Sequence, residues 1–163
     1  MTATPADEPI RYIERTRHYY RALGYERDYV WAHFDEVPFA RLDKPLKQAR
    51  VGLVTTATPP DLSNRDAHGG KHVWSGQVSP APETLLTDMA WDKESTHTKD
   101  RGSYLPIEVA AELAAGGMFA GLAARFHGVP TEYSHRKTMV EDAPEVLARL
   151  RADGADAAIL CAL

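Results

Sequence analysis

The sequence predicts an α/β protein with a mainly parallel sheet and flanking helices. Three observations support this. Residues 50–57, RVGLVTTA, form a short Val/Leu/Thr-rich run ended by TPPD, which is typical of a buried strand. Two helical stretches each carry proline in the first turn and glycine at the end. The second stretch leads into the apolar run AAILCAL, which we interpret as another buried strand.

The first third of the chain is predicted to contain one helix and one strand. Residues 1–8 are expected to be a disordered tail at the start of a single α/β domain, residues 1–163. Residues 9–23 place Ile10, Ile13 and Tyr20 near one face, which predicts an amphipathic helix ending before glycine. The aromatic stretch that follows contains two prolines and is expected to be irregular, up to the strand at residues 50–57.

The rest of the chain alternates polar loops with regular elements. Residues 58–82 are predicted to be a long loop, and residues 84–91 a second strand. Helices are expected from Pro106 to the Gly-Gly pair and over residues 141–154, with an irregular stretch between them and a final strand at residues 157–163. In open α/β sheets ligands bind at the carboxyl ends of strands. We therefore expect chemistry after residue 57 and after residue 163.

Composition narrows the class of protein. Hydrophobic residues make up 44% and charged residues 26% of the chain, with a net charge of −4, so charge gives no reason to expect nucleic acid or an anionic membrane as a partner. No window approaches the roughly 18 consecutive apolar residues of a membrane span, and the N-terminus lacks a signal-peptide core. The single cysteine, Cys161, rules out an internal disulfide. These features predict a cytoplasmic protein.

The segment HGGKH, from His68 to His72, allows three interpretations. Both imidazoles could bind one metal ion with a carboxylate such as Asp66 as third ligand. The glycine N–H groups and Lys71 could instead bind a phosphate, although the spacing is not that of a Walker loop. The third interpretation is a surface loop with solvated histidines.

A second polar segment, WDKESTHTKDRGSYLP, precedes the helix at Pro106. His97 paired with Asp100 would suit general acid–base catalysis, and Lys93 with Arg101 would suit a clamp for an anionic substrate. The alternative is a solvated connector in which each ion pair contributes little. Cys161 has no basic neighbour within its apolar run, which favours a small core residue over a nucleophile.

Three segments carry a resemblance to a known family. They are KPLKQARVGLVTTA, DRGSYLPIEVAAELAAGG and MVEDAPEVLARLRADGADAAILCAL, which together span residues 44–163. Their order resembles the glycine/sarcosine/betaine reductase selenoprotein B family, which includes the selenium-bearing subunit of D-proline reductase. The chain departs from that family at Trp91, Lys93 and Gly102, where we would expect His, Asp and Asn. These departures leave the substrate open.

The resemblance implies reductive cleavage of a C–N bond in a small amine or amino acid. In the family a selenocysteine or cysteine follows the strand that matches AAILCAL, and a partner subunit supplies a pyruvoyl group. The family nucleophile is not carried over to Cys161, which lies within the strand. The implied roles are a substrate pocket shaped by His97 and Asp100 and a substrate carboxylate held by Lys93 or Arg101.

The match also leads to an expectation about the end of the chain. Selenocysteine is encoded by UGA, so we expect codon 164 to be UGA and the sheet to be incomplete at its C-terminal end. The resemblance also implies partner reductase subunits. A chain truncated in this way would expose apolar surface, so we expect aggregation or a homo-oligomer. Two alternatives remain open. One is a non-catalytic relic or interaction domain of the same fold. The other is a metal-dependent enzyme that uses His68, His72 and His97.

Overall fold

The computed structural model describes residues 9–28, 30–37, 39–88, 94, 98–132 and 134–163. The chain divides into two compact units, Met1–Pro38 and Phe39–Leu163. The predicted tail at residues 1–8 lies outside the described residues.

The first unit contains helix α1 (Tyr12–Ala22), which confirms the predicted N-terminal helix. Leu23 is the C-cap of the helix, and Gly24 takes a positive φ of 87° that lets the chain turn. Asp28 then accepts a hydrogen bond of 2.8 Å from Arg21 Nε, which ties the returning segment to the helix. None of the residues of α1 is buried, so the expected apolar face does not form a core within this unit.

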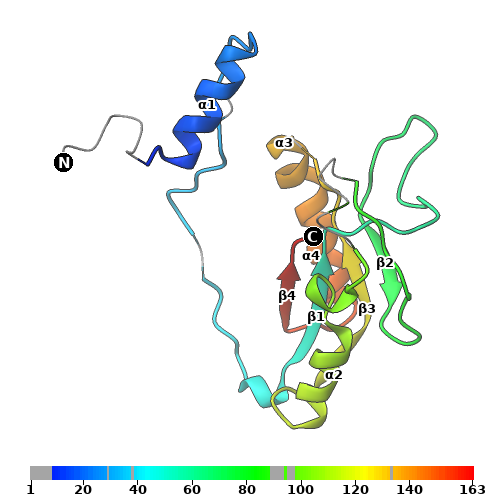
Figure 1. Ribbon diagram of the computed structural model, residues 1–163. Coiled ribbons are helices and arrows are strands. Elements are labelled where there is room, and N and C mark those ends of the chain that lie inside the picture. The colour runs from blue at the N-terminus through cyan, green and yellow to red at the C-terminus, as the bar shows by residue number, and fades with distance from the viewer. Residues whose placement is uncertain (1–8, 29, 38, 89–93, 95–97, 133) are drawn as a thin grey trace, which may run out of the picture. The chain divides into compact units, whose positions relative to one another are not determined.

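The second unit contains a mixed four-stranded sheet with flanking helices, which confirms an α/β fold (Figure 1). Its strands are β1 (Arg50–Thr55), β2 (Trp74–Gln77), β3 (Gly121–Gly128) and β4 (Ala157–Cys161), in the order β2-β3-β1-β4. β1 pairs in parallel with β3 and with β4, and β2 pairs antiparallel with β3.

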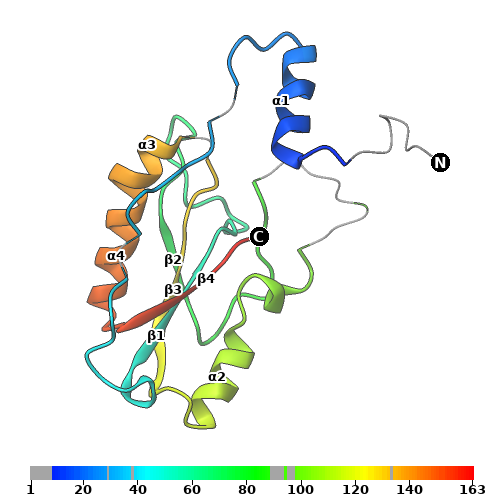
Figure 2. The ribbon, with the colours of Figure 1, turned by 90° about the vertical axis from the view of Figure 1, so that its left-hand side faces the viewer.

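Helices cover both faces of this sheet (Figure 2). Helix α2 (Ile107–Ala115) lies on one face, as predicted. The other face carries a continuous helical stretch of α3 (His135–Lys137), the π-helical η4 (Thr138–Asp142) and α4 (Ala143–Ala152). Short 3-10 helices, η2 (Leu46–Gln48) and η3 (Arg101–Ser103), precede β1 and α2.

The two faces of β1 pack against different helices, one against α4 and the other against the core beneath α2. A Cβ atom at Gly52 would lie 2.3 Å from Leu150 Cδ2, so glycine allows α4 to pack closely on the strand. The opposite face contributes Val51 and Leu53 to the core beneath α2. The other buried side chains of that core come from distant segments: Ala57, Leu85, Tyr104, Leu105, Ile107, Ala110, Phe119 and Phe126.

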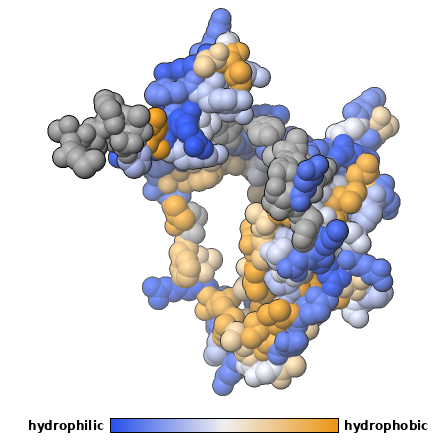
Figure 3. Space-filling view, in the orientation of Figure 1, coloured by the Kyte–Doolittle hydropathy of each residue, from blue (hydrophilic) through white to orange (hydrophobic). Residues whose placement is uncertain are grey.

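Four expectations about strands are wrong. The predicted loop over residues 58–82 contains strand β2. Residues 84–88 form no strand and make only an isolated bridge between Leu86 and Thr58, while residues 89–91 lie outside the described residues. The stretch between α2 and α3 was expected to be irregular, but residues Gly121–Gly128 form strand β3. β4 is a strand as predicted but is not buried, because it pairs only with β1 at the sheet edge. Leu160 is 72% exposed, and hydrophobic side chains gather on the surface over this part of the sheet (Figure 3).

No helix within the described part of the chain is long and apolar enough to cross a membrane.

Candidate functional site

The carboxyl ends of β1, β3 and β4 meet at one edge of the sheet because these strands are parallel. The segments that follow them contact one another there. Leu163 N–H, after β4, donates a hydrogen bond of 2.8 Å to Thr56 Oγ1, after β1. Thr131, after β3, donates to the Thr56 carbonyl at 3.4 Å. This edge therefore gathers three loops, as expected for ligand sites of α/β sheets.

A buried carboxylate, Asp88, organises the first part of this edge. Its side chain is 5% exposed and accepts hydrogen bonds from Thr58 Oγ1 at 3.0 Å and from Arg65. Lys71 Nζ lies 3.2 Å from the same carboxylate. Burial alone raises the pKa of Asp88, but the Thr58 and Lys71 hydrogen bonds and the two cations outweigh it and hold the pKa below its ordinary value. Asp88 is therefore ionised at neutral pH.

A second group surrounds Lys137 at the start of the helical stretch. Lys137 Nζ lies 3.1 Å from Glu132 Oε1 and 3.2 Å from Asp142 Oδ1, and it donates to the Lys71 carbonyl at 2.8 Å. Burial lowers the pKa of Lys137, but the two carboxylates outweigh burial and raise it overall. Lys71 Nζ in turn donates to the Thr131 carbonyl at 3.1 Å, so the two groups form one structure.

We call this structure the edge network. Its ionised members are Arg65, Lys71, Asp88, Glu132, Lys137 and Asp142. Its positive and negative charges compensate one another, which suits it to fixing the loops rather than to holding a free anion. Some of its buried polar atoms, Arg65 Nε and Asp142 Oδ2, have no hydrogen-bond partner in the described structure, and neither does the neighbouring Asn64 Oδ1. A ligand or water at this edge could satisfy them.

The residues predicted from the second polar segment are only partly described. His97 and Lys93 lie outside the described residues. Asp100 is exposed, and its carbonyl accepts a hydrogen bond of 2.8 Å from Oγ of Ser103, the last residue of η3. Arg101 is 17% exposed and donates to the Pro82 carbonyl and to Glu108 in α2. Arg101 therefore connects two segments, while the His97–Asp100 pair stays a prediction.

The HGGKH segment folds around Asp66. The Asp66 carboxylate accepts hydrogen bonds of 2.8 Å from the backbone N–H groups of Gly70 and His68, and His72 Nε2 lies 3.2 Å away. These bonds, the one from Gly70 first, hold the pKa of Asp66 below its ordinary value. The N–H groups that a phosphate would need are thus already occupied. Within the described ranges, no three His, Cys, Asp or Glu side chains could hold a metal ion.

Sequence reasoning missed a second buried polar group, on the face of the sheet covered by α4. His127 of β3 is fully buried, with Nδ1 2.9 Å from Ser75 Oγ and Nε2 3.2 Å from Asp153 Oδ2. Arg125 donates to Asp153 at 2.7 Å, and Arg149 of α4 donates to Ser75 Oγ at 2.9 Å. We call these residues the His127 cluster.

The contacts of the His127 cluster fit a neutral imidazole. With Arg149 donating to Ser75 Oγ, the Ser75 hydroxyl is able to donate to Nδ1, while His127 Nε2 lies 3.2 Å from Asp153 Oδ2 without forming a hydrogen bond. Burial, and then the charges of Arg125 and Arg149, lower the pKa of His127 in spite of Asp153. No pattern in the sequence connects residues 75, 127 and 153, because their contact depends on the fold.

The chain matches no family model, no curated protein and no solved structure.

Proposed function

We propose that the chain is a subunit of a reductase of the glycine/betaine/sarcosine/D-proline type. In this proposal a selenol or thiol in the segment after β4 attacks carbon and displaces nitrogen. The proposal places the protein in the cytoplasm, with a mainly parallel sheet that continues beyond residue 163. The supporting observation is the hydrogen bond between Leu163 N–H and Thr56 Oγ1. A group that follows β4 starts from the carboxyl edge, beside the loop that contributes Arg65 and Lys71 to the edge network.

The resemblance supplies the chemistry of this proposal. A selenol is a soft nucleophile that is ionised at neutral pH, which extends the behaviour of low-pKa thiols. The C–N bond breaks as the new bond to selenium or sulfur forms, and the nitrogen leaves as an amine after activation by the partner's pyruvoyl group. A thiolate of a dithiol then attacks the selenium or sulfur and breaks its bond to carbon, which takes up a proton and leaves as the reduced product. The second thiol of the dithiol closes a disulfide and restores the free selenolate or thiolate.

Binding roles in this proposal fall to the second polar segment. His97 and Asp100 shape the substrate pocket, and a cation from Lys93 or Arg101 holds the substrate carboxylate. Lys93 is our first choice, because Arg101 is already bound by the Pro82 carbonyl and Glu108. The edge network holds the loops in place around the reacting group.

The test uses the complete gene product and any tightly bound partners, purified from the cells that make it. With dithiothreitol as electron donor, we expect amine release from at least one of glycine, sarcosine and betaine, or ring opening of D-proline. Iodoacetate, which alkylates selenolates and thiolates, should abolish turnover. Failure of all four substrates in the intact complex would contradict the proposal.

A second candidate, a non-catalytic interaction domain, is favoured by the first unit. α1 buries none of its residues, and Ile10, Tyr12 and Tyr19 are exposed. Such a surface is typical of a segment that docks on another protein. A stable partner in the purified complex, together with no reductive turnover, would favour this candidate over the reductase.

A further inference from the structure

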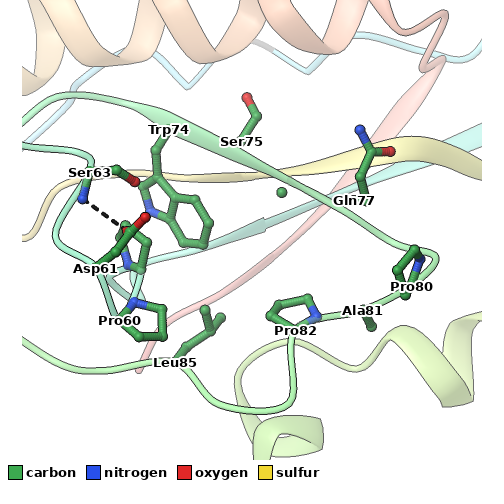
Figure 4. Close-up of a pocket in the computed structure, with 12 residues that line it drawn as sticks. Pro60, Asp61, Ser63, Trp74, Ser75, Gln77, Pro80, Ala81, Pro82 and Leu85 are labelled. Atoms are coloured by element: carbon green, nitrogen blue, oxygen red, sulfur yellow. Dashed lines mark hydrogen bonds between the residues drawn. The ribbon is translucent and has the colours of Figure 1, made fainter.

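A pocket of about 610 Å³ lies beside strand β2 in the second unit (Figure 4). Its volume is within the range of small-molecule sites, about 300–1,000 Å³. The pocket is separate from the edge network: none of the six ionised residues of that network lines it. Figure 4 shows Trp74 and Ser75 on opposite sides of β2, so the pocket takes the Trp74 ring and not the Ser75 hydroxyl as its wall.

The aromatic wall is fixed before any ligand binds. Trp74 Nε1 donates a hydrogen bond of 3.0 Å to the Ala57 carbonyl, and the ring packs edge-on against Phe126 at 5.3 Å. Glycines make this arrangement possible. A Cβ atom at Gly128 would lie 1.8 Å from the Trp74 ring, and one at Gly76 would lie 2.5 Å from Phe126. A ring held in this way loses little entropy when it binds a ligand.

The remaining walls are mostly apolar and rigid. Leu85 is fully buried at the base, and the rings of Pro60, Pro80 and Pro82 line the sides. Proline rings present carbon surface and have no backbone N–H. The pocket is therefore suited to the flat or alicyclic carbon skeleton of a ligand.

Among the described residues that line the pocket, Asp61 is the one charged side chain, and none of them is a lysine, arginine or histidine. Asp61 and Trp74 both line this pocket (Figure 4). Ser63 N–H donates to Asp61 Oδ1 at 3.0 Å, which fixes the carboxylate in a turn. Hydrogen bonds from Ser63 lower the pKa of Asp61, so it is negative at neutral pH.

We propose that this pocket binds an organic cation in which an aliphatic ammonium group is linked to an aromatic or alicyclic ring and which has no carboxylate. The ring packs between Trp74 and the prolines, and the ammonium group pairs with Asp61 and the face of the indole. A ligand carboxylate would be repelled by Asp61 and would find no cation in the lining. The site is therefore distinct from one for the amino acids of the proposed reductase and does not rest on that proposal.

The experiment compares three probes of similar shape, namely 2-phenylethylamine, 2-phenylethanol and phenylacetate. Binding to the full chain is followed through the indole N–H signal of Trp74 in NMR spectra, assigned with Trp74→Phe. We expect saturable binding of the amine, roughly fivefold weaker binding of the alcohol and the weakest binding of the acid. Equal affinity for amine and alcohol, or no saturable shift with any probe, would overturn the proposal.

Asp61→Asn provides the matched variant, since asparagine keeps an oxygen for Ser63 N–H and removes the charge. We expect this variant to bind the amine as weakly as the alcohol, with affinity for the alcohol unchanged. The control is Asp66→Asn, which removes another turn-forming carboxylate that does not line the pocket. An amine preference that survives in Asp61→Asn, or is lost in Asp66→Asn, would place the cation elsewhere and overturn the proposal. Thermal unfolding of each variant checks that it is folded.

Discussion

The edge network and the His127 cluster both bury polar and charged groups in one small unit. They differ in whether a member changes its charge near neutral pH. The edge network pairs lysine and arginine with carboxylates, and the pKa shifts of Asp88 and Lys137 move both groups further from neutrality. The His127 cluster instead depends on a neutral imidazole whose pKa is lowered by burial. The same sheet thus holds its loops with permanent ion pairs and its α4 helix with a contact that depends on pH.

This difference matches the places of the two groups in the fold. The edge network connects loops that follow β1 and β3 with the start of the helical stretch, where the proposed chemistry needs fixed positions. The His127 cluster connects the end of α4 to β2 and β3, and so joins the helix to the face of the sheet that it covers. Variants of each group can test whether the distinction holds.

The largest expected effect is from Asp88→Ala, which leaves Arg65 and Lys71 without their shared carboxylate. Because these cations are partly buried, we expect a loss of about 3 kcal/mol in the free energy of unfolding, measured by urea denaturation. Asp35→Ala is the control, since that side chain is 93% exposed, and should change stability by less than about 0.5 kcal/mol. Similar effects of the two substitutions would mean that the network does not hold the loops.

The His127 cluster should make stability depend on pH near neutrality. In the unfolded chain His127 takes up a proton near its ordinary pKa of 6.5. In the folded chain the pKa of His127 is lower, so its protonation needs a lower pH. The stability from neutral His127 is therefore present above that value and is lost as pH falls through it. Urea denaturation at about pH 7.5 and 5.5 should show a smaller difference for His127→Gln than for the wild type. Equal differences would contradict this account.

Asp153→Asn tests how the nearby carboxylate affects the pKa of His127. The carboxylate partly offsets the effect of burial on His127, so its removal should lower the imidazole pKa further. An NMR titration of His127 measures this directly. We also expect a loss of roughly 1–3 kcal/mol, because Arg125 loses its charged partner. An unchanged or raised His127 pKa would show that Asp153 does not act on the imidazole.

Arg101→Ala should have a smaller effect, a loss of about 1 kcal/mol in the free energy of unfolding. The substitution removes the hydrogen bonds to the Pro82 carbonyl and to Glu108, which water can replace. In the intact reductase complex a purely connecting role predicts little change in substrate KM. A large rise in KM with unchanged stability would instead favour Arg101 as the residue that holds the substrate carboxylate.

The smallest effect is expected for His68→Ala, since the exposed imidazole is not needed for the backbone N–H that Asp66 accepts. Stability measured by thermal unfolding should change by less than about 0.5 kcal/mol. Added zinc should not raise the melting temperature of wild type above that of this variant. A zinc-dependent rise lost in His68→Ala would support the metal-dependent alternative.

Local signals account for the elements that the sequence predicted correctly. Proline at the start and glycine at the end mark α2 and α4, and a run of β-branched residues marks β1. β3 carries Arg125 and His127 on the face covered by α4, so its pattern is not that of an apolar strand. His127 is buried and Arg125 is partly exposed, and their partners come from residues 75, 149 and 153, which sequence reasoning alone could not bring together.

The candidate site shows the same limit. Lys71 was noticed for its place in HGGKH, but its partners Asp88 and Thr131 are distant in sequence and meet it only when the loops fold together. Arg101 was noticed for its charge, but neighbouring segments occupy its guanidinium group. Residue type thus identified some of the right side chains, while their roles depended on tertiary contacts.

The measurement that tests the central claim most directly is the intact mass and selenium content of the protein as its native cells make it. If the reductase proposal is right, the product extends beyond residue 163, with a selenocysteine or cysteine within about the first turn after β4. Selenium, when present, should stay with the protein under denaturing conditions. A product with neither selenocysteine nor cysteine after Cys161 would contradict the claim.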